Sequence, residues 1–312
     1  MNDVVVKLLW TGGFDSTYRL CELVRQGIKV EPYYVFYKGR KSTPFELKAQ
    51  KQILSFLSDK GYGNLILPVN YNQPDSFTID RSILDCFFEV SKEHSLVTQT
   101  VLFSGFSKIN KGIELSYEKR NNDFRHFVDK EMVFYKNDVG SYVMDKEKSS
   151  ARAYLLFGDF SFPVLFKTNE EMYHSMIEWG FSKIFDLVHF CFSSHEEPCG
   201  VCSSCFNKLR DGLFDYRFSE LAKKRFRVYF HLRKIDCNGK VPYSKYRYLL
   251  AFLYSYFIMN SFSYFMNIAL SMKIETMEFN KLCMFFKQFD SFSLEEIDNY
   301  FVSHKTIFDI LS

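Results

Sequence analysis

The sequence predicts an α/β protein whose parallel sheet is covered by helices, followed by a helical C-terminal segment. Three observations support this fold class. Apolar runs of strand length alternate with amphipathic stretches up to residue 105. The first apolar run leads directly into two glycines. Four closely spaced cysteines follow between residues 191 and 205.

The expected elements follow from hydrophobic periodicity. Strands are predicted at 4–10, 28–37, 64–69 and 101–105, and helices at 45–58, 79–93 and 170–179, with a further helix starting after residue 14. Ligands of such sheets lie at the carboxyl ends of the strands. That edge is expected to carry residues 11–17, 37–41 and 104–108. Residues 111–148 are charged, with a hairpin expected around 137–140, and form either a cover over the site or a solvated loop.

The stretch from Leu8 to Thr17 has the features of a phosphate-binding loop. An apolar strand, two glycines and a helix start bring backbone N–H groups toward an anion without Cβ atoms in the way. A carboxylate here would hold a magnesium ion carried by the phosphate. The candidate binding residues are Thr11, Gly12, Gly13, Phe14, Asp15, Ser16 and Thr17. The alternative is an ordinary helix N-cap after a turn.

The cysteine group predicts a structural metal site. Cys191, Cys199, Cys202 and Cys205 have the Cys-x2-Cys spacings with which single turns supply two ligands each. Zn²⁺ takes four thiolates tetrahedrally, and an iron–sulfur cluster is the chemical alternative. His189 and His195 lie nearby, and either could replace a cysteine, although such histidines more often face solvent or orient a ligand.

Composition limits the class of protein. The chain has 312 residues and a net charge of +3, which gives no bulk electrostatic argument for binding nucleic acid or a membrane. The N-terminus shows no secretory signal pattern, so we expect a cytoplasmic protein. Residues 248–272 carry no charge, but their serines, asparagines and tyrosines favour a buried or partner-covered helix over a membrane span.

We expect two domains, 1–220 with the cysteine site and 221–312 as a helical extension. A helix is predicted over 206–222, and further helices over 276–289, 294–302 and 305–311. Basic residues between 223 and 234 alternate with aromatic ones, and a solvated helix face is favoured there over a nucleic-acid surface. The extension is expected to pack on the domain or to bind a partner chain, with a homodimer as one arrangement.

The glycine loop resembles the signature of the PP-loop ATP pyrophosphatases, Ser-Gly-Gly-x-Asp-Ser, with Thr11 in place of the first serine. Together with Cys-x7-Cys-x2-Cys-x2-Cys it resembles the 7-cyano-7-deazaguanine synthase family. Residues 35–40 with Glu46-Leu47, and residues 162–165, are similar to further stretches of that family. The resemblance covers about residues 4–210. Residues 104–117 lack the family's Tyr-Pro-Asp-Cys-Arg stretch.

The resemblance implies a Rossmann-like parallel sheet, a four-cysteine zinc knuckle, and ATP and Mg²⁺ as ligands. It implies a ligase in which the carboxylate of 7-carboxy-7-deazaguanine, or a similar deazapurine, attacks the α-phosphate of ATP, and an amine then displaces AMP. Asp15 and Ser16 would act in catalysis, backbone at Phe36 and Tyr37 would meet adenine, and Lys108, Lys111 and Lys167 would add phosphate contacts. A protein amine in a phage-defence setting is a further candidate acceptor.

Two other classes remain open from the sequence. A tRNA-modifying PP-loop enzyme would need RNA-binding surface, for which the basic run at 223–234 is the one candidate. A non-catalytic nucleotide-binding subunit would need no acceptor, but the intact Thr-Gly-Gly-Phe-Asp-Ser sequence argues against it.

Overall fold

The computed structural model describes residues 4–94, 96–119, 123–193, 195–235, 244–259, 262–272 and 274–305. The chain divides into two compact units, Met1–His189 and Phe190–Ser312. The expected boundary at residue 220 groups the cysteines with the N-terminal domain, whereas this division falls just before the first of them.

The first unit is built on a seven-stranded sheet with the order β3-β2-β1-β4-β7-β6-β5. The strands are β1 (Val5–Leu9), β2 (Lys29–Val35), β3 (Asn70–Asn72), β4 (Ile113–Glu114), β5 (Phe134–Lys136), β6 (Tyr142–Met144) and β7 (Phe160–Phe162). Strands β1, β2, β3, β4 and β7 run parallel, and β6 pairs antiparallel with both β5 and β7. This mostly parallel sheet with its helices confirms the predicted α/β class.

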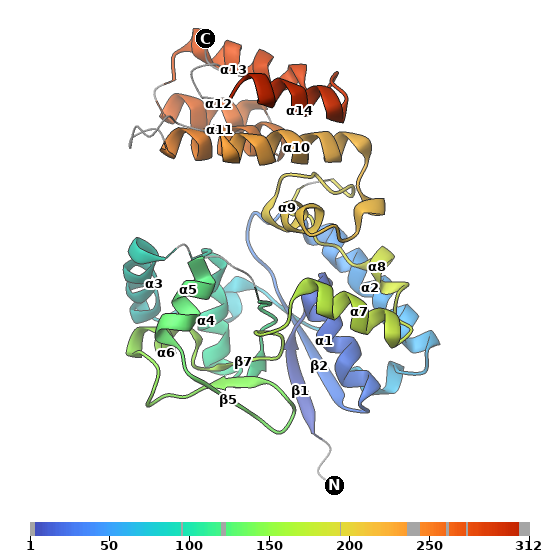
Figure 1. Cartoon of the computed structure of the whole chain (residues 1–312). Coiled ribbons are helices and arrows are strands. Elements are labelled where there is room, and N and C mark those ends of the chain that lie inside the picture. Colours follow the sequence, from blue (N-terminus) through green and yellow to red (C-terminus); the bar gives the residue numbers. More distant parts are fainter. Residues whose placement is uncertain are drawn as a thin grey trace. The chain divides into compact units, whose positions relative to one another are not determined.

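Helices form a layer on each face of the sheet (Figure 1). One layer holds α1 (Phe14–Arg25), α2 (Thr43–Asp59), α7 (Asn169–Glu178) and α8 (Ile184–Leu187), and the other α3 (Arg81–Glu93), α4 (Gln99–Ile109), α5 (Asp123–Glu131) and α6 (Ala151–Phe157). Beneath the second layer, a core of buried aromatic and aliphatic side chains includes Leu9 of β1 and Phe160 of β7.

The strand predicted at 101–105 is wrong, because these residues belong to α4. Nearly every side chain from Thr100 to Ser107 is buried, so the run shows no polar face. A short apolar run of this kind does not distinguish a buried strand from a buried helix. The strand that continues the parallel sheet is β4, a two-residue strand that pairs with β1 and β7.

Other predicted elements shift in position. The strand expected at 64–69 is found instead at 70–72, as β3. Within 64–69, Ile66 makes one isolated β-bridge to Val30. The apolar stretch 154–166, whose residues are also of a strand-forming type, lies partly in α6 and forms a strand only at β7. The hairpin expected around 137–140 is confirmed, since β5 and β6 pair across it. Thr168 caps α7 through a reciprocal pair of hydrogen bonds with Glu171, which accounts for the helix start expected there.

The second unit holds the cysteines and then helices: α9 (Ser203–Arg210), α10 (Glu220–Lys234), α11 (Ser244–Met259), α12 (Phe262–Ser271), α13 (Thr276–Gln288) and α14 (Leu294–Ser303). Helix α10 packs on both α11 and α14 (Figure 1). The single helix expected over 206–222 is wrong: Gly212 and Phe214 have positive φ values of 69° and 60° and interrupt it, and Ser219 caps α10. The helix expected at 305–311 lies outside the described residues, apart from Lys305.

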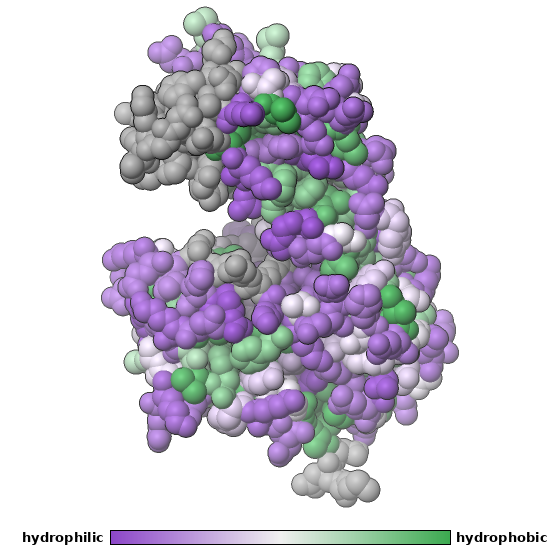
Figure 2. Space-filling view, viewed as in Figure 1, coloured by the Kyte–Doolittle hydropathy of each residue, from purple (hydrophilic) through white to green (hydrophobic). Residues whose placement is uncertain are grey.

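The uncharged stretch 248–272 falls within α11 and α12. Among the residues that the structure describes, no helix combines the length and the hydropathy needed to cross a bilayer. Helix α12 exposes large apolar side chains, with Phe262 52%, Tyr264 49% and Leu270 56% exposed. In the space-filling view, hydrophilic side chains cover most of the surface and hydrophobic ones form small scattered groups (Figure 2).

Candidate functional site

The glycine loop, residues 10–13, joins β1 to α1 at the point where the sheet order reverses. From β1 the sheet continues to β2 and β3 on one side and to β4 and β7 on the other. In doubly wound sheets this switch point, outside the carboxyl ends of the strands, is where ligands bind. The fold therefore places the predicted phosphate loop at the expected ligand edge of the sheet.

Gly12 cannot be replaced without disturbing the loop. Its φ is 75°, in the left-handed region. A Cβ there would lie 3.0 Å from the Glu46 carbonyl oxygen and 3.2 Å from Gln50 Cγ. The Gly12 carbonyl accepts a hydrogen bond from His189 N–H at 3.0 Å. Helix α2 and the end of the first unit thus hold the loop on both sides.

Trp10 anchors the start of the loop. Its side chain is fully buried, and its indole Nε1–H donates to Thr17 Oγ1 at 3.0 Å. Gln50 Nε2 donates to the Trp10 carbonyl at 2.8 Å. The predicted ligand-binding residue Thr17 is fully buried, and its hydroxyl oxygen ties α1 to β1.

Asp15 and Ser16 carry polar atoms that call for a ligand. Asp15 Oδ1 and Ser16 Oγ are buried, yet neither has a hydrogen-bond partner among the described residues. Buried polar atoms without partners are rare in folded proteins, and each needs an explanation such as a bound ion or molecule. Both atoms lie in the first turn of α1, where free N–H groups and the helix dipole favour negative charge. These observations fit a phosphate with its cation.

The remaining loop residues have clear local roles. Thr11 Oγ1 accepts a hydrogen bond from Gly13 N–H at 3.3 Å, which shapes the turn. The Phe14 ring is buried and contacts Phe185 edge to face, with 6.1 Å between ring centroids. Thr11 and Gly13 therefore lie in the loop itself, whereas the side chain of Phe14 serves the core.

Phe36 and Tyr37 follow β2 at the same edge of the sheet. Phe36 N–H donates to the Asn72 carbonyl at 2.9 Å, and its ring contacts Tyr34. The Tyr37 hydroxyl lies 2.9 Å from Thr98 Oγ1. The sheet therefore brings both residues to the ligand edge beside the loop. That their backbone contacts adenine stays a prediction.

Glu46 is the centre of a buried network at the start of α2, a role that its sequence motif does not reveal. Its side chain is 3% exposed. Its carboxylate accepts hydrogen bonds from the Tyr34 hydroxyl at 2.8 Å, from Arg40 Nε at 2.7 Å and from Ser42 Oγ at 2.7 Å. Burial raises the pKa of Tyr34 above its usual value, and the Glu46 charge adds to this. The network fixes the end of α2 that contacts Gly12.

The three lysines expected to reach phosphate differ in environment. Lys108 lies in α4 and pairs with Asp159 at 2.7 Å, so its predicted position at a strand end is wrong. Lys111 is exposed beyond that helix. Lys167 donates to the Tyr18 hydroxyl at 2.6 Å and to Glu22 Oε1 at 2.8 Å.

Burial alone would lower the pKa of Lys167, but the hydrogen bonds to Glu22 and Tyr18 raise it overall. Lys167 therefore stays charged beside α1. The expected edge segment 104–108 is also corrected. Ser104 lies inside α4, where its hydroxyl donates to the carbonyls of Thr100 and Leu156.

The four cysteines come together as the sequence predicts. All four side chains are buried, and their Sγ atoms lie within 4.8 Å of one another. The cluster consists of Cys191, Cys199, Cys202 and Cys205. Neither His189 nor His195 belongs to this group; the His189 ring stacks on Phe45 instead.

Backbone N–H groups around the cysteines point at sulfur. Cys199 N–H donates to Cys191 Sγ at 3.3 Å, and Val201 and Cys202 N–H donate to Cys199 Sγ at 3.4 and 3.3 Å. Such bonds favour thiolate over thiol. Hydrogen bonding with Cys199, and then with Cys202 and Cys205, lowers the pKa of Cys191. The donor set is therefore one that suits Zn²⁺ or an iron–sulfur cluster.

Gly200 makes the turn between two of these cysteines. Its φ is 83°, and a Cβ would lie 2.1 Å from the Ala222 carbonyl oxygen in α10. No side chain fits between this turn and the helix. The second unit therefore packs its first long helix directly on the cysteine turn.

The basic run of α10 is engaged within its own unit. Lys223 pairs with Asp215 at 3.0 Å, and Arg227 lies 3.6 Å from Asp298. Arg233 and Lys234 lie over the rings of Phe206, Tyr229 and Phe230. These four residues thus have partners within the unit, whereas Arg225 Nε is buried and has no hydrogen-bond partner among the described residues.

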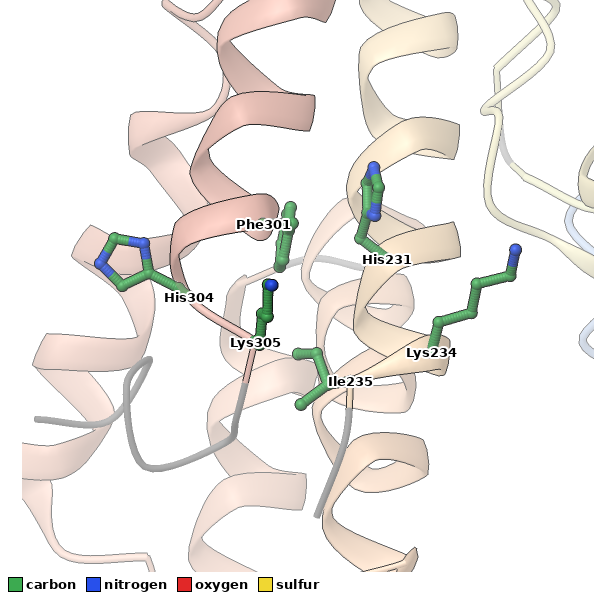
Figure 3. A pocket seen from close by; sticks show the side chains of 6 residues that line it. All are labelled: His231, Lys234, Ile235, Phe301, His304 and Lys305. Carbon is green, nitrogen blue, oxygen red and sulfur yellow. The ribbon is translucent and has the colours of Figure 1, made fainter. Parts of the chain in front are cut away.

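A pocket of ≈ 250 Å³ lies between α10 and α14 in this unit (Figure 3). It is lined by His231, Lys234, Ile235, Phe301, His304 and Lys305. His231 Nε2 lies 2.7 Å from Asp298 Oδ1, and its ring stacks on Phe301. His231 and Lys234 lie in the last turn of α10, where positive charge complements the helix dipole. Their presence there has a structural explanation.

Glu93, His94 and Glu131 also lie close enough together to hold a metal. However, Arg152 donates to both carboxylates, with Nη1 2.8 Å from Glu93 Oε1 and Nε 2.8 Å from Glu131 Oε2. These hydrogen bonds lower the pKa of Glu93 to about 2. The guanidinium thus takes the place that a cation would need.

No family model matches the chain, and no curated protein matches it.

Proposed function

We propose that this protein is an ATP-dependent ligase of the 7-cyano-7-deazaguanine synthase type, with a PP-loop fold and a structural zinc site made by the four clustered cysteines. The observation that carries the proposal is the glycine loop at the switch point with the buried, unpartnered Asp15 Oδ1 and Ser16 Oγ among the described residues. A carboxylate beside a hydroxyl and free helix N–H groups suits a magnesium-bound polyphosphate.

Each loop residue has a part in this proposal. Thr11, Gly12, Gly13 and Ser16 would hold the β- and γ-phosphates of ATP, and Asp15 would hold Mg²⁺, which neutralises charge on the departing pyrophosphate. Backbone at Phe36 and Tyr37 would meet adenine. Catalysis is then chiefly positioning and stabilisation of charge.

The reaction proceeds in two displacements. A carboxylate oxygen of the deazapurine attacks the α-phosphorus of ATP, an oxygen–phosphorus bond forms, and pyrophosphate leaves. An amine nitrogen then attacks the activated carbonyl carbon, AMP leaves with the bonding electrons, and the nitrogen loses a proton. The product is an amide. Dehydration of that amide with a second ATP would give a nitrile, and use of a protein amine would give a conjugate.

The cysteine site would serve structure rather than chemistry. Four thiolates fill the tetrahedral positions of zinc and leave no open position for substrate. The C-terminal helices contribute no candidate catalytic group to the proposal, and their exposed apolar side chains on α12 suit a partner chain.

The test is pyrophosphate release from ATP, with and without 7-carboxy-7-deazaguanine. Wild type is expected to show release that depends on this substrate. Asp15→Ala and Ser16→Ala are expected to reduce it strongly, and the exposed Asp59→Ala in α2 serves as control. Absence of substrate-dependent release in wild type, or full activity of Asp15→Ala, would overturn the proposal.

The fate of the activated acyl group is tested by mass spectrometry. Incubation with ATP, 7-carboxy-7-deazaguanine and either ammonia or candidate acceptor proteins separates the outcomes. A free amide or nitrile identifies a small-molecule product, and a mass gain on a protein identifies a conjugate.

A further inference from the structure

The segments that follow β4 and β7 carry a second polar cluster, which we define as Ser116, Glu118 and Asn169. Strands β4 and β7 are parallel neighbours, so their following segments leave the sheet at the same edge. Leu115 N–H donates to the Ser161 carbonyl at 2.8 Å, and Lys119 N–H donates to the Lys167 carbonyl at 2.8 Å. The two segments therefore run side by side beyond the strands.

The side chains after β4 divide between the two faces of the sheet. Ile113, Leu115 and Tyr117 contact the core beneath α3 to α6. Glu114 instead binds Arg19 of α1, and Glu118 binds Asn169 of α7. Ser116 lies between these two glutamates, at a tight turn in which Tyr117 N–H donates to the Leu115 carbonyl. The polar cluster thus belongs to the layer of α1 and α7.

Asn169 presents a fixed hydrogen-bond acceptor. Its side chain is 7% exposed, and its Nδ2 donates to Glu118 Oε1 at 3.3 Å. A carboxylate only accepts hydrogen bonds, so it orients the amide with nitrogen toward Glu118 and oxygen away. Asn169 Oδ1 is buried and meets no donor within the described part of the chain, and the same holds for Ser116 Oγ.

Contacts connect this cluster to the phosphate loop. Lys167, two residues before Asn169, binds the Tyr18 hydroxyl and Glu22 of α1. Tyr18 is three residues from Asp15, which is one turn of the same helix. Unpartnered polar atoms thus follow three adjacent strands, at Asp15 and Ser16 after β1, at Ser116 after β4 and at Asn169 after β7.

We propose that Ser116, Glu118 and Asn169 bind the base of the deazapurine carboxylate that is activated by ATP, and that they select a heterocyclic base with an N–H donor edge. This inference rests on the proposed function and adds the specificity determinants of the same site. Asn169 Oδ1 accepts an N–H of the exocyclic amine, the Ser116 hydroxyl supplies a second polar contact, and Glu118 keeps the amide in this orientation. A guanine-like edge, with a ring N–H beside an exocyclic amine, matches this arrangement.

The experiment compares two probes in the full-length protein: 7-carboxy-7-deazaguanine and its analogue without the 2-amino group. Their dissociation constants are measured by calorimetry without ATP, in wild type, Asn169→Ala, Ser116→Ala and Ser175→Ala. The control residue Ser175 lies in the same helix as Asn169, and its hydroxyl donates to the Glu171 carbonyl. Affinity for a non-hydrolysable ATP analogue is measured in parallel to detect general damage.

Wild type and Ser175→Ala are expected to bind the 2-amino probe about tenfold more tightly than the analogue, which is typical of one buried hydrogen bond. In Asn169→Ala this ratio is expected to fall toward one, with ATP-analogue affinity unchanged. The ratio reports selectivity, so a modest loss of folded protein does not imitate the result. An unchanged ratio in both Asn169→Ala and Ser116→Ala, or no binding of either probe to wild type, would overturn the inference.

The two proposals fail in different ways. If pyrophosphate is never released but the 2-amino probe binds with Asn169-dependent selectivity, the proposed reaction fails and the base-binding site stands. If pyrophosphate release is normal but Asn169→Ala changes neither the KM for 7-carboxy-7-deazaguanine nor the selectivity between the two probes, the site assignment fails and the reaction stands.

Discussion

Replacement of Glu114 by glutamine tests whether a buried ion pair holds α1 on the sheet. Arg19 Nε and Nη2 donate to the two Glu114 carboxylate oxygens at 2.8 and 2.7 Å, and both side chains are 2% exposed. Ser141 Oγ also donates to this carboxylate, and Arg19 Nη2 reaches the Val139 carbonyl at 2.9 Å. Burial alone would lower the pKa of Arg19, but its bonds to Glu114 raise it overall. Glu114→Gln would therefore leave a buried positive charge.

The expected loss is about 3 kcal/mol in free energy of unfolding. Removal of one partner of a buried pair costs about 3–5 kcal/mol. The lower end applies because Glu22 Oε2 still lies 2.7 Å from Arg19 Nη1. For a domain of 150–250 residues this corresponds to a fall of about 6–12 °C in Tm. Asp85→Asn is the control. Asp85 pairs with Arg81, but the two side chains are 61% and 87% exposed, respectively, so this ion pair contributes less than about 1 kcal/mol to stability.

The assay is urea unfolding at pH 7, with calorimetry for Tm. A double change of Arg19 and Glu114 to methionine is expected to be at least as stable as Glu114→Gln, because it removes the buried positive charge while Glu22 keeps its bond from Lys167. A cost for Glu114→Gln as small as that of the control would refute the reasoning. So would a double variant that is less stable than the single one.

Three further outcomes are expected. Gly200→Ala should lower Tm and the metal content of the protein, because a Cβ at this position would lie 2.1 Å from an α10 carbonyl oxygen. Gly212→Ala is the control: Gly212 also has a positive φ, but a Cβ there would meet no atom within 4 Å, so this variant should keep the metal content of wild type. Equal metal content in the two variants would contradict this. Cys202→Ser should reduce bound zinc or iron measured by mass spectrometry, and wild type purified with neither metal would count against the site. Burial alone would raise the pKa of Glu22, but hydrogen bonds from Lys167 and Arg19 lower it overall. The ionised Glu22 therefore stabilises the fold above the pKa that it has in the unfolded chain, and this stabilisation is lost as the pH falls. Between about pH 5 and 3, the free energy of unfolding should decrease more in wild type than in Glu22→Gln. Parallel curves of unfolding free energy against pH would exclude this role.

Features that depend on neighbouring residues could be predicted from the sequence. The glycine turn after β1 and the cysteine cluster both use residue types that act within a few positions of one another. Helix starts at Thr168 and Ser293 were also predictable, because each cap bonds to a glutamate three residues later. Local chemistry of this kind needs no knowledge of the fold.

The acceptor side could not be predicted because it depends on strand order. With 101–105 as the fourth strand, the substrate edge is expected to begin at Ser104, but this residue is buried in α4. The true strand has two residues, too short for any periodic pattern. Ser116 and Asn169 lie far apart in the sequence and share a sheet edge only because β7 pairs with β4.

The outermost strands of the sheet bear on how this protein can associate. Strands β3 and β5 lie at the two edges, and each has three residues. An edge of this length offers few free main-chain groups, so it is a poor template for adding a strand from another molecule. Continuous sheets across two copies are thereby disfavoured. Helical faces are the surfaces on which association is then expected, and α12, which carries no charge and exposes Phe262 and Leu270, is one of them.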